Sequence, residues 1–263
     1  MFYREQPLPP ETAHAALCVW SFALEPADPA FVEHKVPPDG TTNLLVALTP
    51  EGQAFRRLVG PSIAATHIPV AQGWRYVGLR LRPEAAEAVT GRAPGTLVGA
   101  SDALAGCDAI IADLEACARE PDAPLRTDRI VAALAEVSPD PIVAAAVDAL
   151  IANGGTGPIG RLAEASGLGA RQFRRRFESA TGLSPKQFAS VQRVRRALIL
   201  SLECPSWSEV AVDSGYADQA HLSRAVRSRF GISPRQIGGY INGIRHSFVG
   251  HVPFVQDRPD NPG

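Results

Sequence analysis

The segment from Ile159 to Gln236 contains an internal repeat, and this repeat limits what the second half of the chain can fold into. The first copy ends in Gly182-Leu183-Ser184-Pro185 and the second in Gly231-Ile232-Ser233-Pro234, 49 residues further on. Self-similarity at a fixed spacing is the mark of a duplicated structural unit. The repeat therefore predicts two similar units, one after the other.

Each copy is predicted to be a helix, a tight turn and a second helix. Gly167 and Gly215 supply the positive φ that the turn needs, because glycine has no Cβ to clash. Ala163 and Ala211, each four residues earlier, are small enough for the two helices to cross. The second helices carry apolar residues at i, i+4, which predicts a stripe that faces a core. These residues are Phe173 and Phe177 in the first unit, and Leu222 and Val226 in the second.

The opposite faces of the second helices are polar and rich in arginine. Arg and Gln side chains have the geometry for bidentate hydrogen bonds with guanine and adenine edges in the major groove. We therefore predict base contacts from Arg171, Gln172, Arg174, Arg175, Gln219, His221, Ser223, Arg224 and Arg227. Contacts with DNA phosphates are predicted for Arg176, Arg193 and Arg196.

A long helix from Pro185 to Leu202 is predicted between the two units, because apolar residues recur there at three and four residues. At 1.5 Å per residue, its 18 residues span ~27 Å. A strut of this length sets two recognition helices about one DNA turn apart, ~34 Å, on one face of a duplex.

Charge is distributed unevenly although the formal net charge is only −1. Residues 1–138 hold 11 Lys and Arg against 17 Asp and Glu, whereas residues 139–238 hold 13 against 8. This asymmetry is expected when only one domain touches phosphate.

The repeated units resemble the AraC/XylS family of bacterial transcription regulators, over roughly the last 40% of the chain. The matching marks are the paired helix-turn-helix units, the two Gly-x-Ser-Pro ends, and Gly215-Tyr216 before the second recognition helix. Val226 departs from the pattern, since the family usually has an aromatic residue there. The resemblance implies a sequence-specific regulator that binds double-stranded DNA. It also places Arg175 and Arg224 at base-contacting positions, together with Arg171, Arg174, Gln219 and Ser223.

The N-terminal half shows β-like patterning from Ala15 to Arg82. Short apolar runs are separated by Pro, Gly, Asp and Thr, which predicts six strands of a small barrel or sandwich. The predicted strands are Leu17–Phe22, Phe31–Val36, Asn43–Leu48, Phe55–Val59, Ile63–Val70 and Arg75–Leu81. In the last of these, Val77, Leu79 and Leu81 alternate with arginine, which is typical of a half-buried strand.

This half resembles the cupin-like sensor domains of AraC-type regulators. The resemblance depends on the turn Pro38-Asp39-Gly40 and on the strand end Gly78-Leu79-Arg80-Leu81-Arg82-Pro83. It implies a small-molecule effector, for which Trp20 and Trp74 are candidate pocket residues, although large aromatic residues on strands more often belong to a core.

The predicted fold is α+β with two domains. Residues 1–100 form the sensor domain, with its first 12 residues irregular, and residues 101–138 form a helical connector. The DNA-binding domain runs from 139 to 240 and begins with a helix that Asp140 caps. Residues 241–263 are predicted to be a disordered tail.

An enzyme is the competing interpretation. Glu33, His34 and His67 would be the ligands of a metal-binding cupin, but the His-x-His pair of such sites is missing. Isolated histidines on strands are more often surface or core groups, so we predict no metal, no cofactor and no catalytic residue. A cupin-type enzyme or small-molecule binder with an accessory basic domain remains the alternative.

The remaining sequence features concern location and partners. The four cysteines are scattered, which favours a reduced, cytoplasmic protein. No apolar run approaches the ~20 residues that a membrane helix needs. Besides DNA, we expect a homodimer and contact with RNA polymerase as further partners.

Overall fold

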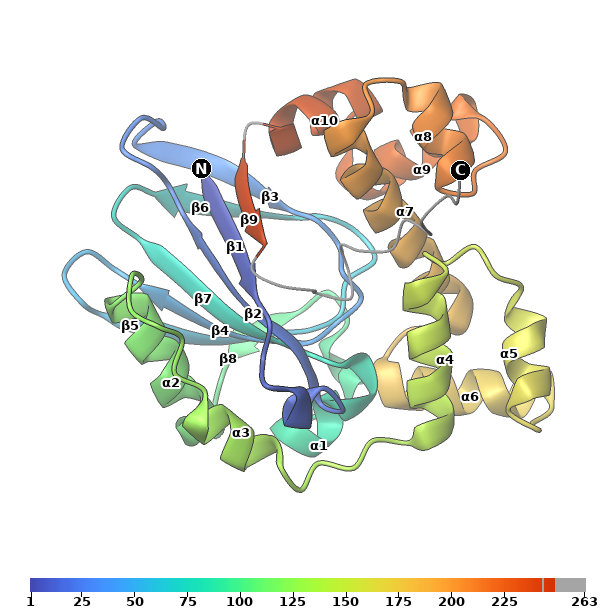
Figure 1. The fold of residues 1–263 in the computed structure, drawn as a ribbon, viewed down its shortest axis with the longest axis horizontal. Helices are drawn as coiled ribbons and strands as arrows, with labels where there is room; N and C mark the ends of the chain where they lie inside the picture. The colour runs from blue at the N-terminus through green and yellow to red at the C-terminus, as the bar shows by residue number, and fades with distance from the viewer. Residues whose placement is uncertain (243, 249–263) are drawn as a thin grey trace, which may run out of the picture.

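The computed structural model describes residues 1–242 and 244–248, which form an N-terminal sheet domain and a C-terminal helical domain (Figure 1). The predicted α+β two-domain architecture is therefore confirmed. The main sheet has the strand order β8-β5-β4-β7-β2-β1-β9, and only β1 and β9 pair in parallel. Its strands are β1 (Phe2–Gln6), β2 (Ala16–Ala23), β4 (Asn43–Leu48), β5 (Ala54–Val59), β7 (Arg75–Leu81), β8 (Ser101–Ala103) and β9 (Arg245–Phe248). A separate antiparallel ribbon joins β3 (Phe31–Val36) and β6 (Thr66–Ala71).

The central strands of the main sheet, β2, β4 and β7, are largely buried on both faces. Helices α2 (Asp108–Arg119) and α3 (Asp128–Leu134) cover one face, where Leu79 and Leu81 pack with Ile110 and Leu114. The β3–β6 ribbon contributes to a second apolar cluster on the other face. The predicted half-buried character of β7 is therefore wrong, because Arg80 is only 5% exposed despite facing away from the first core.

The six strands predicted between Ala15 and Arg82 are all present, with ends shifted by at most three residues. The prediction that residues 1–12 are irregular is wrong for Phe2–Gln6, which pair with β2 as β1. Pairing with a neighbouring strand stabilises β1, and such a tertiary effect overrides weak local patterning. In the hydrogen-bonding pattern of the described strands, β8 and β9 are the two ends of an open sheet, and the cupin-like assignment stays a prediction.

The predicted connector 101–138 packs closely on the sheet. Ile110, Ile111 and Ile130 belong to the same core as Leu44 of β4. Between β7 and this region, the chain forms the short helices η2 (Pro83–Ala85), α1 (Ala86–Thr90) and η3 (Pro94–Leu97), after an earlier turn η1 (Pro10–Thr12). The connector therefore shares its apolar core with the sheet, and the domain boundaries at 100 and 138 remain predictions.

The C-terminal domain is built around α7, which contributes to two separate cores. Phe188 packs with Phe173 and Phe177, whereas Val194 and Leu198 belong to a second cluster. The helices are α4 (Pro141–Ala152), α5 (Ile159–Ala165), α6 (Ala170–Thr181), α7 (Pro185–Glu203), α8 (Trp207–Asp213), α9 (Gln219–Phe230) and α10 (Pro234–Asn242). Residues 139–242 form no strand, as predicted from their patterning.

The predicted disordered tail is wrong at its start. Residues 241 and 242 complete α10, and Arg245–Phe248 form β9 beside β1 (Figure 1). Backbone pairing with an otherwise open sheet edge accounts for this strand, because an edge presents unpaired N–H and C=O groups. Residue 243 and residues 249–263 lie outside the described residues.

No helix in the described part of the chain combines the length and apolar character needed to span a bilayer.

Candidate nucleic-acid interface

The repeated Gly-x-Ser-Pro ends have a local structural explanation. Gly182 and Gly231 end the second helix of each unit with positive φ values of 76° and 68°, a conformation that glycine adopts without strain. Ser184 then starts α7, where its hydroxyl accepts from the Gln187 N–H, and Pro185 occupies the first helical position.

The second unit repeats this arrangement at Ser233. Its hydroxyl accepts from the Gln236 N–H, while Oε1 of Gln236 accepts from the Ser233 N–H. In both units the Gly-x-Ser-Pro sequence therefore ends one helix and caps the start of the next.

Both helix-turn-helix turns use a glycine at positive φ. The φ values are 69° at Gly167 and 75° at Gly215. Ala163 and Ala211 are buried in the cores of their units. A Cβ added to Gly215 would lie 2.4 Å from Cγ2 of Thr156. Thr156, in the loop after α4, is therefore in close contact with Gly215, in the turn of the second unit. This contact links the two units.

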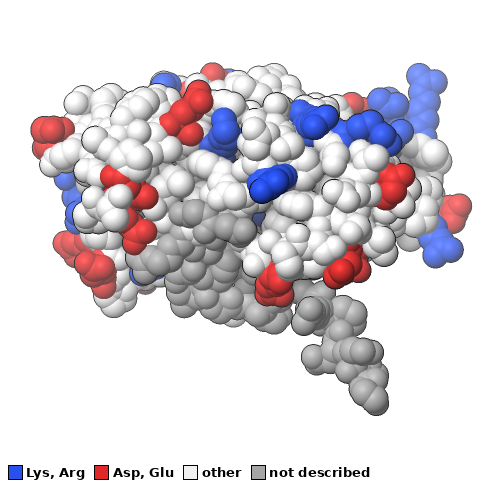
Figure 2. All heavy atoms as spheres, turned by 90° about the horizontal axis from the view of Figure 1, so that it is seen from above, with Lys and Arg blue, Asp and Glu red and all other residues white. Residues whose placement is uncertain are grey.

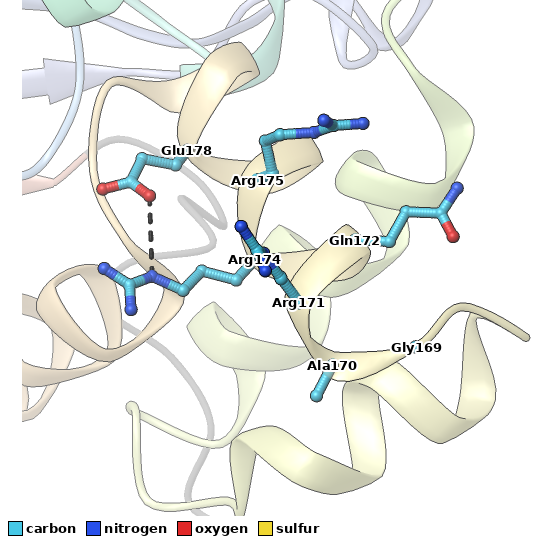
Figure 3. Close-up of a pocket in the computed structure, with 7 residues that line it drawn as sticks. All are labelled: Gly169, Ala170, Arg171, Gln172, Arg174, Arg175 and Glu178. Atoms are coloured by element: carbon cyan, nitrogen blue, oxygen red, sulfur yellow. Dashed lines mark ion pairs between the residues drawn. The ribbon is translucent and has the colours of Figure 1, made fainter.

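The first recognition helix, α6, exposes all four side chains predicted to contact bases, Arg171, Gln172, Arg174 and Arg175. They line a surface groove of about 750 Å³ together with Gly169, Ala170 and Glu178 (Figure 3). Arg175 and Gln172 extend to the same side, whereas Arg174 turns toward Glu178, with 3.6 Å between Nε and Oε2. Phe173 and Phe177 lie on the buried side of the helix.

The second recognition helix, α9, presents a less cationic surface. Gln219, His221, Arg224 and Arg227 are exposed, and Ser223 is half-buried. The carboxylate of Asp218 caps the helix by accepting from the His221 N–H at 2.6 Å. The His221 ring meets Tyr216 edge-on, with 5.1 Å between ring centroids. This contact fixes His221 at the start of the helix.

Comparison with known proteins identifies the domain that contains these two helices. Residues 162–238 match a family model described as "Helix-turn-helix domain". Residues 162–238 form an AraC-type helix-turn-helix domain. Over 79 residues the chain is 30% identical to the virulence regulon transcriptional activator VirF of Yersinia enterocolitica and 32% identical to the transcriptional regulator MtrA of Neisseria gonorrhoeae.

These matches cover 30% of this chain, and they span only 29% of VirF and 26% of MtrA. Among solved structures, ToxT from Vibrio cholerae aligns over 92% of this chain and 99% of its own, with 8% identity and a TM-score of 0.45. That likeness is too low to support an argument about function.

Arg176, Arg193 and Arg196, which were predicted to contact phosphate, each contact a different part of the protein. Nε of Arg176 donates to Asp140, the residue that caps α4. Nη2 of Arg193 donates to the Gly155 carbonyl at 2.7 Å, and its guanidinium lies over the Tyr216 ring. This arrangement favours a structural role for Arg193. The half-buried Arg196 lies against Gly154 at the end of α4.

Positive charge is concentrated on the helical half of the molecule. Figure 2 shows Lys and Arg side chains gathered along one edge of the surface, with Asp and Glu more frequent over the sheet domain. This agrees with the charge count by sequence, and the four arginines of α6, at 171, 174, 175 and 176, are all exposed. A field of this sign attracts phosphate.

The candidate effector and metal residues are engaged in packing. Nε1 of Trp20 donates to Asn43 at 2.9 Å, and its ring covers Gly78, while Trp74 stacks on Phe55. The structure therefore uses both tryptophans in the apolar cluster between sheet and ribbon.

The three candidate metal ligands do not converge. Glu33 lies 3.6 Å from Nδ1 of His67, whereas His34 is stacked on Phe22 and bonded to the Tyr240 hydroxyl of α10. Desolvation by burial lowers the pKa of His34 to about 4, so the ring is neutral near pH 7. Among the described residues, no three His, Cys, Asp or Glu side chains are arranged to hold a metal ion.

Residues that sequence reasoning did not assign to a role form a buried charge cluster where the sheet domain meets α7. Asp39 and Arg80, from the two N-terminal motifs, pair at 3.2 Å beneath α7. Arg80 also pairs with Glu5 at 2.6 Å. Burial raises the pKa of Glu5, but Arg80 and Arg195 outweigh this effect and hold that pKa below its ordinary value.

The turn that contains Asp39 also contacts the AraC-type domain directly. A Cβ at Gly40 would lie 3.1 Å from the Phe188 ring of α7, and Gln192 donates to the Asp39 carbonyl. The Pro-Asp-Gly and Gly-x-Arg-x-Arg-Pro patterns could have signalled this role, since both place charge where a strand or turn ends.

Proposed function

We propose that this protein is a sequence-specific transcription regulator whose helices α6 and α9 read adjacent major-groove segments of double-stranded DNA. The observation that supports this most is the equivalence of Arg175 and Arg224. Each lies two residues after a buried anchor, Phe173 or Leu222, and each is exposed on the opposite face. A bidentate arginine–guanine contact requires such a free guanidinium on a helix that fits the groove.

Helix α7 supplies the spacing between the two readers. Its 19 residues span ~28 Å, and it is anchored in the cores of both units. The rigid connection supports simultaneous reading of two segments about one DNA turn, ~34 Å, apart.

The rest of the proposal concerns the whole chain. The N-terminal domain contacts α7 and is positioned to pass the state of a small-molecule effector to the DNA-binding units. We include a cytoplasmic location, a homodimer and contact with RNA polymerase in the proposal. We also propose that the protein is not an enzyme, which is supported by the regulatory names of the relatives matched in the C-terminal domain.

Selection of bound DNA from random duplexes, followed by sequencing, tests this function with the full chain. We expect one enriched motif with two informative blocks whose centres lie about 10–10.5 base pairs apart. A double variant, Arg175→Ala with Arg224→Ala, should lose the enrichment, whereas Arg57→Ala on the exposed side of β5 should retain it. Absence of any enriched motif with the unmodified protein would overturn the proposal.

A further inference from the structure

A second groove, of about 520 Å³, lies between the N-terminal domain and the first recognition helix. Its lining brings an N-terminal carboxylate next to the arginines of α6. The polar residues that line it are Glu87, Asp140, Gln172, Arg175 and Arg176. The N-terminal domain therefore borders the surface that is proposed to read DNA.

Arg175 is common to this groove and to the one in Figure 3. With 100° per residue, Arg175 lies almost opposite Phe173, the buried anchor of α6. Gln172 and Arg176 lie on one flank of Arg175, and Arg171 lies on the other. A duplex that contacts Arg175 from outside must therefore pass close to the flank where Glu87 stands.

The helix that carries Glu87 is held firmly beside α6. Arg82, just before η2, pairs with Glu84 at 2.5 Å and with Asp148 of α4 at 2.6 Å. At the end of α6, a Cβ on Gly182 would lie 2.8 Å from the Pro94 backbone, so η3 is in close contact. Contacts on both sides of α1 thus hold the backbone that carries Glu87 beside the recognition helix.

The two carboxylates of the groove differ in how they are satisfied. Asp140 accepts from Arg176 and from the Ile142 and Val143 N–H groups, so its charge is largely balanced. Glu87 is exposed, and within the described part of the chain it forms no ion pair. A free carboxylate at the rim of a phosphate-binding surface repels phosphate at short range.

We propose that Glu87 is part of the DNA interface, where its charge opposes the approach of phosphate to α6. The N-terminal domain thereby acts on DNA affinity directly, through electrostatics. This inference rests on the proposed function. It concerns the affinity for all duplexes, since repulsion of the backbone carries no sequence information.

The test is a charge series at position 87 in the full chain, with Glu87→Gln and Glu87→Lys. Dissociation constants are measured for the selected duplex and for a scrambled one at several salt concentrations. We expect Glu87→Gln to tighten both by about three- to tenfold at low salt, with less effect at high salt. Glu87→Lys should tighten both further and make the slope of log K against log salt steeper by about one.

Matched substitutions at Glu51, in the turn between β4 and β5, control for the change in overall charge. They should alter both dissociation constants by less than twofold. Equal affinities for the unmodified protein, the Glu87→Gln variant and the Glu87→Lys variant would overturn the inference, as would tightening on the selected duplex alone. If the unmodified protein binds the selected and the scrambled duplex with equal affinity, the proposed function itself fails, which is a separate outcome.

Discussion

The two helix-turn-helix units share the residues that end and start their helices. They differ in the number of exposed arginines on the recognition helix and in how the sheet domain contacts them. Helix α6 carries arginines at 171, 174, 175 and 176, whereas the first half of α9 carries Gln219, His221 and Ser223 ahead of its arginines. The sheet domain borders α6 near its DNA-reading face through α1. It meets the second unit elsewhere, where the Ala65 N–H donates to the Arg229 carbonyl and the Lys35 N–H donates to the Tyr240 hydroxyl.

This difference separates two ways in which the sheet domain can influence DNA binding. Beside the first unit, a carboxylate stands close to the recognition surface and changes the local field. Beside the second unit, hydrogen bonds to the end of α9 and to α10 hold the position of the helices. The first influence depends on salt, whereas the second depends on the stability of the contacts.

The largest expected difference between the units concerns their cores. Phe177 and Val226 occupy equivalent positions and are both fully buried. Phe177→Ala should lower the free energy of unfolding by about 3–5 kcal/mol, and Val226→Ala by about 2 kcal/mol, because less apolar surface is lost. Denaturant unfolding measures both values.

Two exposed positions give matched controls for these substitutions. Phe31 is 61% exposed and Val212 is 68% exposed, so their replacement by alanine should cost little. A cost for Val226→Ala equal to that for Phe177→Ala would show that the second core has no room to relax, against the expectation from side-chain size.

Acid should weaken the attachment of the second unit. Unfolded His34 takes up a proton below about pH 6.5, whereas burial keeps the folded ring neutral down to about pH 4. Between these values the unfolded state binds more protons, so stability falls as pH falls, by up to about 3 kcal/mol. Unfolding measured from pH 7 to pH 4 should show this loss, and His34→Gln should reduce it.

The control for this titration is His67→Gln, since His67 is an exposed residue on the neighbouring strand β6. This substitution keeps His34 and its hydrogen bond with Tyr240, so the acid-induced loss that is due to His34 should remain. If His34→Gln leaves the acid-induced loss of stability unchanged, another titrating group is responsible. In that case, protonation of His34 does not weaken the contact with Tyr240 of the second unit.

Base reading should be divided between the units. Arg175→Ala and Arg224→Ala should each weaken binding of the selected duplex ~5- to 150-fold, equivalent to about 1–3 kcal/mol. Each change should relax the preference at one or two base pairs, and the two sets should lie about one DNA turn apart. Competition binding against single-base variants of the duplex locates both sets. Equal losses on selected and scrambled DNA would mean that these arginines only supply charge.

The sequence predicted the six central strands and the order of the helices because alternation and i, i+4 spacing are local signals. The repeat also located both recognition helices, since glycine turns and Ser-Pro starts fix helix ends. Val226, which departs from the family pattern, is fully buried in the second core, so the departure reduces the size of the side chain without exposing it.

The contacts between domains were beyond prediction, because they join residues far apart in sequence. Asp39 was recognised as part of a turn, but the hydrogen bond from Gln192 of α7 to its carbonyl forms only because this turn lies against that helix. Glu87 belongs to no motif recognised in the sequence. Its proposed role depends on the packing of α1 beside α6, which only the structure shows. The burial of Arg80 was missed for a related reason, since alternating arginine normally indicates a solvent-facing side.

The smallest expected difference concerns how the two recognition helices begin. Asp218 caps α9 with its side chain, whereas the N-cap residue of α6 is Gly169, which has no side chain. Asp218→Ala should lower the free energy of unfolding by about 1 kcal/mol, and Gly169→Ser should raise it by a few tenths of a kcal/mol. Serine fits there because φ and ψ are −64° and 147° and an added Cβ would meet no atom within 4 Å. Asp218→Ser, which keeps a capping oxygen, is the control and should restore most of the loss. A destabilised Gly169→Ser protein would show that α6 depends on a free backbone at its start, and the two helices would then differ in more than their caps.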